Sequence, residues 1–362
     1  MLINDLLERF IGLRVIRAHH LGAPHTRRQN RTLAFHREAF DAIKTMEAHN
    51  GKKLTPALKR KADEYARDVL GGAEYAPWLY VYATMQGTFR EGWMPDNFYQ
   101  LVVVPRICKG LAAATDMKSF SDVVLDTEAL PDIAYHVDGI FYDREFNVID
   151  RAKLREIARP FGKVFVKLDN SGKGAAIAVV KADDLLTHDF AEDCAIQRPI
   201  QQHPLFDEMV AGPVATLRVT TARAPDGTIS RRGARLRMGR PSSQWVQSDQ
   251  QMQVAVSDDA GTLEDICYDP DWRAWDRHPD TGFVFKGVRI PQFDKAVQFC
   301  RNLHRRVPHI PMIGWDLAIN RNEDVELIEW NGGHCGIKFC EAVSGPHFTD
   351  MNWERFAPIA SK

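Results

Sequence analysis

Hydrophobic positions divide the chain into a helical beginning and a longer part in which short strands alternate with helices. In two series, Leu6 to Leu13 and Leu33 to Met46, apolar residues recur at the spacings of one helix face. Thr55-Pro56 is a typical helix start, because proline is well tolerated at the first helical position. We therefore predict a helical N-terminal region over residues 1–95.

After this region, short apolar or alternating segments predict strands. In the segment 216–221, Arg218 lies on one strand face with its threonine neighbours, and in 231–240 the side chains of Arg235 and Arg237 share a face. Further strands are expected at 101–104, 140–142, 163–167, 175–180 and 194–200, and helices at 150–158 and 293–307.

A polar turn at 320–324 lies between two short apolar segments, which together predict a β-hairpin over 313–333. Asp316 opens the first strand of this hairpin, and Glu329 and Asn331 close the second. Antiparallel pairing brings these ends together, and residues two positions apart on a strand point to the same face. Converging hard oxygen donors suit Mg²⁺, so the hairpin predicts a magnesium site.

Two alternatives concern this part of the chain. The hairpin could be a surface element with solvated polar ends, but Trp315 and Trp330, which we expect to frame the acids, argue against that. His334, Cys335 and Cys340 could hold zinc. Four residues separate the two cysteines and no second ligand pair is at hand, so buried thiols are the better interpretation.

Composition and charge limit the classes of function. The chain has 362 residues, enough for one large unit or for two to three small ones, with 44% hydrophobic and 26% charged residues, as in ordinary globular proteins. A net charge of −1 gives no drive toward nucleic acid, and no apolar run approaches the roughly 18 residues of a membrane span. Six scattered cysteines indicate reduced thiols. We expect a cytoplasmic protein without a transmembrane segment; the oligomeric state stays open.

Basic residues gather between positions 9 and 37. Such a group could contact a membrane surface, a nucleic acid or an acidic partner, but a solvated helical face is the preferred interpretation.

A small glycine-containing loop follows Lys167 and runs from Leu168 to Gly174. Backbone N–H groups in such a loop can face a ligand, so the segment is a candidate phosphate cradle. It is not a Walker A loop, since no G-x-x-x-x-G-K-[ST] occurs and a strand is expected where that motif needs a helix. The alternative is an ordinary hairpin turn.

Several motifs together resemble a known family. In the motif IGWDLAI…LIEWN, Glu329 lies thirteen positions after Asp316, and Asn331 lies two positions after Glu329. Two further motifs occur earlier in the chain, TLRVTT at 216–221 and RLRMG at 235–239. These motifs resemble the ATP-grasp superfamily and, more narrowly, its sugar-transfer-associated family. The resemblance covers about residues 90–345. It implies an α+β fold in which two α+β lobes hold ATP between them. The ATP-grasp region would span residues 96–362, with a nucleotide lobe at about 130–205 and a catalytic lobe at about 206–345.

The resemblance also implies roles for individual residues. Lys118 and Lys167 would contact the phosphates of ATP. The loop residues Ser171, Gly172 and Gly174 would fold over the triphosphate, and adenine would lie near Gln197 and Ile200. One extra residue between Asp116 and Lys118 departs from the family pattern.

The metal would be Mg²⁺, with Mn²⁺ as an alternative, on Asp316, Glu329 and Asn331. Arg218 and Arg237 would lie near the γ-phosphate as catalytic residues, since guanidinium groups bind phosphate at two points. For Arg235 a surface ion pair is an equal alternative.

The activity implied is that of an ATP- and Mg²⁺-dependent carboxylate-amine ligase in glycan or secondary-metabolite assembly. A small-molecule carboxylate would form an acyl phosphate, and an amine would then displace phosphate. Two rivals remain: a kinase on the same fold, and a non-catalytic nucleotide-binding module. The intact set of metal ligands argues against the module, but nothing in the sequence separates ligase from kinase.

Overall fold

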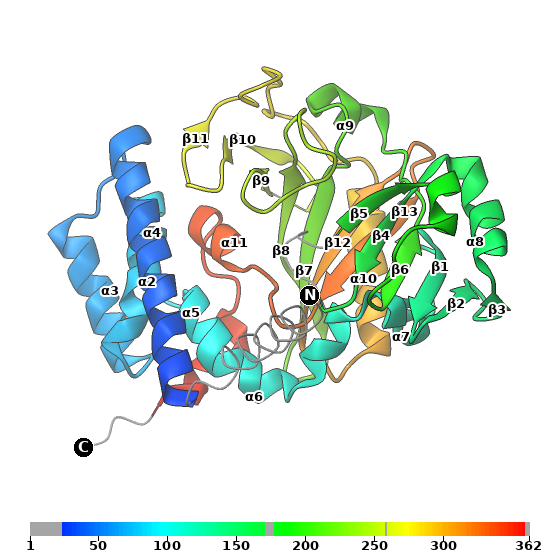
Figure 1. Cartoon of the computed structure of the whole chain (residues 1–362). Coiled ribbons are helices and arrows are strands. Elements are labelled where there is room, and N and C mark those ends of the chain that lie inside the picture. The colour runs from blue at the N-terminus through cyan, green and yellow to red at the C-terminus, as the bar shows by residue number, and fades with distance from the viewer. Residues whose placement is uncertain (1–23, 171–176, 258, 359–362) are drawn as a thin grey trace, which may run out of the picture.

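The computed structural model describes residues 24–170, 177–257 and 259–358. Its first part is helical: α2 (Pro24–His49), α3 (Pro56–Asp68) and α4 (Ala76–Gln86) lie side by side, apart from the strands (Figure 1). The predicted helix start is confirmed, because Thr55 Oγ1 accepts a hydrogen bond from Leu58 N at 3.3 Å. The first apolar series, Leu6 to Leu13, lies outside the described residues.

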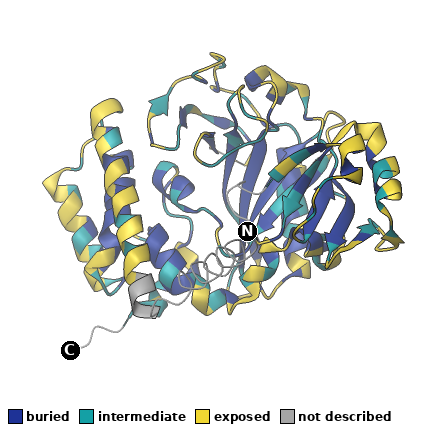
Figure 2. Cartoon of the chain, in the orientation of Figure 1, coloured by how far each residue is buried: buried dark blue, intermediate teal, exposed yellow. Residues whose placement is uncertain are grey.

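Helix α4 is buried at every position from Ala76 to Met85. It packs against α2 and α3 and against α11 (Lys338–Val343), which comes from the opposite end of the sequence. A helix that is apolar all round needs such a cover on each side. Figure 2 shows the result: the outer faces of α2 and α3 are exposed, and α4 lies behind them.

The strand expected at 101–104 is wrong. This apolar run is part of a continuous helical stretch made of α5 (Asp96–Phe98), a π-helical turn (Tyr99–Val103) and α6 (Val104–Cys108). A short apolar run has no period that separates a strand from a buried helix, and Val102 and Val103 are buried here by helix packing. Short 3-10 turns then lead to α7 (Ser121–Leu125).

The strands of the described residues form two antiparallel sheets. The first has the order β3-β2-β1-β6-β4-β5, and α8 (Arg151–Ala158) packs on β1 and β2. Its strands are β1 (Asp132–Val137), β2 (Ile140–Asp143), β3 (Val148–Ile149), β4 (Lys163–Leu168), β5 (Ile177–Lys181) and β6 (Cys194–Gln197).

The second sheet has the order β11-β10-β9-β8-β7-β12-β13. Helix α10 (Phe293–Arg306) packs on β7, β8, β12 and β13, and the short α9 (Pro204–Met209) connects the two sheets. The strands are β7 (Thr216–Arg223), β8 (Ile229–Met238), β9 (Met252–Val256), β10 (Leu263–Tyr268), β11 (Ala274–Trp275), β12 (Met312–Ile319) and β13 (Val325–Asn331). Strands β12 and β13 confirm the predicted hairpin.

The two tryptophans of the hairpin do not frame the acids. Trp315 and Trp330 are paired across the strands and stack with ring centroids 6.2 Å apart, on the face that forms the core with α10. Trp315 Nε1 donates to Thr221 Oγ1 at 2.8 Å, and Thr221 Oγ1 lies 2.7 Å from Nδ1 of the buried His304. Side chains alternate along a strand, so the neighbours of Asp316 and Glu329 point away from them.

Among the described residues, the structure has no helix that is both long and apolar enough to cross a membrane. All six cysteines, including Cys335 and Cys340, are buried and free of disulfides.

Candidate active site

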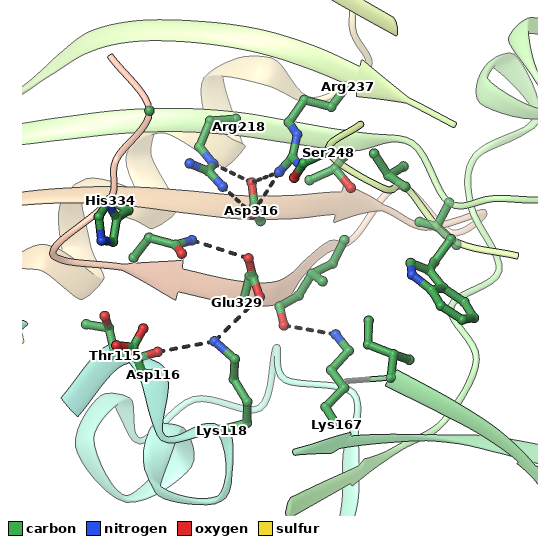
Figure 3. Close-up of a pocket in the computed structure, with 18 of the residues that line it drawn as sticks. Thr115, Asp116, Lys118, Lys167, Arg218, Arg237, Ser248, Asp316, Glu329 and His334 are labelled. Carbon is green, nitrogen blue, oxygen red and sulfur yellow. Dashed lines mark hydrogen bonds and ion pairs between the residues drawn. The ribbon is translucent and has the colours of Figure 1, made fainter. Parts of the chain in front are cut away.

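A cavity of about 830 Å³ lies where the two sheets and the helical part meet. The first sheet contributes Phe165 and Lys167 to its wall, and the second sheet contributes Arg218, Asp316 and Glu329. Figure 3 shows how these side chains lie: the arginines and acids stand on the second sheet, and Lys118 and Lys167 approach from the other side.

Four charged residues form one row across the second sheet. Arg235 on β8 pairs with Arg218 on β7, Arg218 pairs with Asp316 on β12, and Asp316 pairs with Glu329 on β13. Directly opposed residues of antiparallel strands point to the same sheet face, and all four line the cavity. The row is therefore ordered as two cations followed by two anions. We call these four residues the charged row.

A β-bulge sets the last position of the row. Asp316 lies opposite Glu329, but the next pair is Leu317 opposite Leu327, so Ile328 is an extra residue on β13. Without it, alternation from the buried Leu327 would carry Glu329 to the core face. The bulge turns Glu329 and Asn331 toward the cavity and leaves Trp330 in the core.

Asp316 is held by both predicted catalytic arginines. Arg218 donates to it at two points, Nε to Oδ1 at 2.5 Å and Nη2 to Oδ2 at 2.6 Å, and Arg237 Nη1 lies 3.2 Å from Oδ2. Burial alone would raise the pKa of the Asp316 carboxyl, but the two guanidinium charges hold it well below its usual range. Asp316 is therefore ionised at any working pH.

The arginines are fixed by further contacts. Arg218 Nη1 donates to the carbonyl of Cys335 at 3.1 Å, and Arg237 Nε donates to Gln251 Oε1 at 2.6 Å. Arg235 is not the surface ion-pair residue that was the alternative: it is 6% exposed and donates to the carbonyl of Gly336 at 2.5 Å.

The two lysines reach the row from the opposite wall. Lys118 Nζ lies 3.5 Å from Glu329 Oε2 and 3.3 Å from the carbonyl of Thr115. Lys167 Nζ lies 3.5 Å from the carbonyl of Ile328, the extra residue of the bulge. Burial lowers the pKa of Lys167, and the nearby Glu329 partly offsets this. A space bounded by lysines on one side and arginines on the other suits a polyphosphate.

The remaining predicted residues fall into three groups. Gln197 and Ile200 line the cavity, and the Gln197 side chain donates to Asp132 Oδ1 at 2.7 Å. The Asn331 amide nitrogen lies 3.4 Å from Glu329 Oε1. The loop residues Ser171, Gly172 and Gly174 lie outside the described residues.

The donor set of the hairpin fits Mg²⁺. Two carboxylates that face each other on paired strands repel unless a cation lies near them, and here Lys118, Arg218 and Arg237 supply positive charge. Asp316, Glu329 and Asn331 offer only oxygen ligands from one end of the hairpin, the set that a hard divalent cation prefers.

Sequence reasoning missed part of the cavity wall. Phe35, Asp96 and Gln100 of the helical part line it, as do Trp245 and Ser248 of the segment between β8 and β9. The one available signal was Asp96, a lone acid close to Trp93, Phe98 and Tyr99, which are buried.

Comparison with known proteins gives one family match. The family described as sugar-transfer associated ATP-grasp matches residues 161–352. No curated protein matches the chain.

Several solved structures are remotely similar. The biotin carboxylase domain of the 2-oxoglutarate carboxylase of Hydrogenobacter thermophilus is 13% identical with a TM-score of 0.41, covering 69% of this chain and 47% of that one. The N5-carboxyaminoimidazole ribonucleotide synthetase of Thermotoga maritima is 14% identical with a TM-score of 0.36, covering 68% and 51%. The ATP-grasp ligase PsnB, complexed with a minimal precursor, is 13% identical with a TM-score of 0.40, covering 81% and 74%. This chain spans about half the length of the first two, and at these TM-scores the similarities add no argument to the family match.

Proposed function

The chain belongs to the sugar-transfer-associated ATP-grasp family, and on that premise we propose that it is an ATP- and Mg²⁺-dependent ligase that joins a carboxylate to an amine. The predicted α+β ATP-grasp fold, with a helical region before it, is confirmed by the match. In this proposal about residues 130–205 form the nucleotide lobe and about residues 206–345 the catalytic lobe.

The observation that carries the proposal is the charged row opposite Lys118 and Lys167. Phosphoryl transfer needs little covalent chemistry from the protein, so positioning and charge supply most of the catalysis. The triphosphate would lie between the lysines and the row, with adenine near the backbone of Gln197 and Ile200. Mg²⁺, when bound by Asp316, Glu329 and Asn331, would neutralise charge on the phosphate oxygens.

The chain's own arginines account for the next step. A carboxylate that has attacked the γ-phosphate becomes an acyl phosphate, a dianion that must be kept from water until the amine arrives. Arg218 and Arg237 are aligned by Asp316 and by Gln251, so their donors are already oriented when charge develops. The amine nitrogen then bonds to the acyl carbon, phosphate leaves with the electron pair of the broken C–O bond, and the proton lost by the nitrogen goes to the departing phosphate.

Hydroxylamine trapping tests this proposal without knowledge of the natural amine. Hydroxylamine replaces the amine and converts an acyl phosphate to a hydroxamate. With ATP, Mg²⁺ and a panel of carboxylates, we expect hydroxamate and ADP from at least one carboxylate. Glu329→Gln should lower this rate by at least ~10²-fold, the scale for losing a charged group that stabilises the transition state. Glu323→Gln, at the exposed turn of the same hairpin, is the control and should change little.

Other outcomes identify the rivals. ADP formed with a phosphoester and no hydroxamate would establish a kinase. Nucleotide binding without any ADP release across the panel would establish a binding module. Full activity of Glu329→Gln would remove the metal assignment.

A further inference from the structure

The cavity continues past the charged row and ends at the helical part. Phe35 and Glu38 of α2 and Asp96 and Gln100 of the α5–α6 stretch form its far wall, together with the segment from His334 to Lys338 that follows β13. Most of the residues that line this end belong to parts of the chain that precede the first strand. We call it the helical end of the cavity.

Two of the charged groups at the helical end compensate each other. Lys338 Nζ forms an ion pair with Glu38, and it also lies 5.1 Å from the centre of the Trp78 ring. These contacts satisfy both groups within the protein.

Asp96 has no such partner in the part of the chain that the structure describes. It is 6% exposed, and among those residues it forms no ion pair and its Oδ1 accepts no hydrogen bond. Burial raises the pKa of its carboxyl to about 6, with Lys338 and Arg235 opposing the rise, so the group is mostly ionised at neutral pH. A buried carboxylate without a partner is costly, and a donor or cation from a ligand would remove that cost.

Arg235, the first member of the charged row, is the matching cation. It is also 6% exposed and forms no ion pair among the described residues, although two arginines stand beside it on the sheet. Its Nη1 donates to the carbonyl of Gly336, its guanidinium lies 5.6 Å from the Phe339 ring centre, and its Nε finds no hydrogen-bond partner among the residues that the structure describes. Burial lowers the pKa of Arg235 to about 10, which leaves it charged at neutral pH.

We propose that the helical end binds the acceptor of the ligation and that this acceptor is a free amino acid, with its ammonium on Asp96 and its carboxylate on Arg235. The ammonium gives one proton to the Asp96 carboxylate, and the free amine then attacks the acyl carbon. A cation alone would leave Arg235 uncompensated, and an anion alone would leave Asp96 uncompensated. A single molecule with both charges satisfies both groups. The inference rests on the proposed ligase function, because it identifies the amine substrate of the same site.

Calorimetric titration of the full chain, saturated with Mg²⁺ and a non-hydrolysable ATP analogue, tests the charge pattern directly. The probes are the twenty protein amino acids and their D-forms. We expect at least one to bind, and its N-acetyl and carboxamide derivatives to bind at least about tenfold more weakly, since each derivative loses a hydrogen bond to a charged group. Absence of binding by every amino acid, or equal affinity for the derivatives, overturns the proposal.

Two substitutions assign the groups. Asp96→Asn should weaken binding of the amino acid at least about tenfold and leave the affinity for its N-acetyl derivative unchanged. Arg235→Gln should remove the preference for the free carboxylate over the carboxamide. Asp41→Asn, the same change on the exposed face of α2, is the control. A loss that is equal for all three ligands would mean that Asp96 only supports the structure, and the proposal would fail.

The hydroxylamine assay separates this inference from the ligase function. Hydroxylamine needs no acceptor site, so hydroxamate formation by the wild type is measured beside its amino-acid binding, and the two readouts are independent. Hydroxamate without any amino-acid binding would overturn the acceptor assignment and leave the ligase standing. Amino-acid binding without hydroxamate would overturn the ligase, and with it the role of acceptor.

Discussion

Lys118 and Lys167 face the same acids but are held differently. Lys118 has a carboxylate partner in Glu329, whereas the Lys167 ammonium has the carbonyl of Ile328 at 3.5 Å. Burial lowers the pKa of Lys167, which means that its charged form is poorly compensated before a ligand arrives. Such a group gains most from an incoming phosphate, because the ligand restores the lost solvation.

Lys167→Ala should therefore weaken binding of a non-hydrolysable ATP analogue by at least about tenfold, the scale of one hydrogen bond between charged groups. The matched control is Lys163→Ala, an exposed lysine on the same strand, β4, which should stay within about twofold. Calorimetric titration of both variants measures the difference. Equal losses would show that Lys167 is not a phosphate ligand.

At the scale of elements, the strands that carry the charged row were the most predictable feature. The hairpin β12–β13 and the arginine strands β7 and β8 follow from short alternating segments, and their order brought Arg218, Asp316 and Glu329 together in the structure. These features are local, because alternation and turn chemistry depend on neighbours in the sequence.

The features that sequence missed depend on tertiary contacts. The bulge at Ile328 is one extra residue in the pairing of two strands. The sequence indicates it only through the spacing of two core residues, Leu327 and Trp330, which are three positions apart. Strict alternation forbids that spacing. Asp96 became a candidate site residue only when the helical stretch around it, which had been expected to include a strand, was seen to close the cavity.

The pairing of β8 with β9 places Arg237 beside Gln251, and from this position we predict the effect of replacing Arg237. This residue spans from Gln251, just before β9, to Asp316 on β12, and a lysine can reach one of these but not both. Arg237→Lys should keep the affinity for the ATP analogue within about threefold but let the acyl phosphate hydrolyse. We expect the ratio of ADP to hydroxamate to rise at least about twofold.

Arg240→Lys, beyond the end of the same strand and paired with Asp280, is the control for Arg237. An unchanged ratio in Arg237→Lys would mean that Arg237 does not hold the acyl phosphate.

At the scale of the whole molecule, one buried carboxyl joins the helical part to the C-terminal segment that follows the second sheet. Glu341 on α11 accepts from Met94 N and from His347 N, each at 2.8 Å, and its own carbonyl accepts from Trp93 Nε1 at 2.9 Å. Burial raises the pKa of Glu341 to about 8, and the two backbone donors only partly oppose this. The folded protein therefore favours the protonated carboxyl.

The sign of the pH dependence follows from this pKa. Because the folded value lies above the ordinary value of 4.5, the contribution of Glu341 to stability is complete below pH 4.5 and is lost as the pH rises through about 8. Glu341→Gln cannot ionise. Relative to this variant, the wild type should lose roughly 2–5 kcal/mol of unfolding free energy between pH 5 and pH 9.

Urea unfolding of both proteins at a series of pH values measures this difference. Glu91→Gln, on the exposed loop before Trp93, controls for a change of charge and should give a constant offset. A difference between wild type and Glu341→Gln that does not depend on pH would show that Glu341 is ionised in the folded protein.

The all-round burial of α4 has a consequence for how the protein is made. Part of its cover is α11, so Trp78 and Tyr82 share a core with Phe339 and Ala342, and Gln86 donates to the carbonyl of Ala342 at 2.9 Å. On the ribosome, α4 emerges long before α11 has been translated. Its apolar surface must stay open to solvent or to a chaperone until then. The helical end of the cavity also needs the segment up to Lys338, so it cannot form before that segment has been translated.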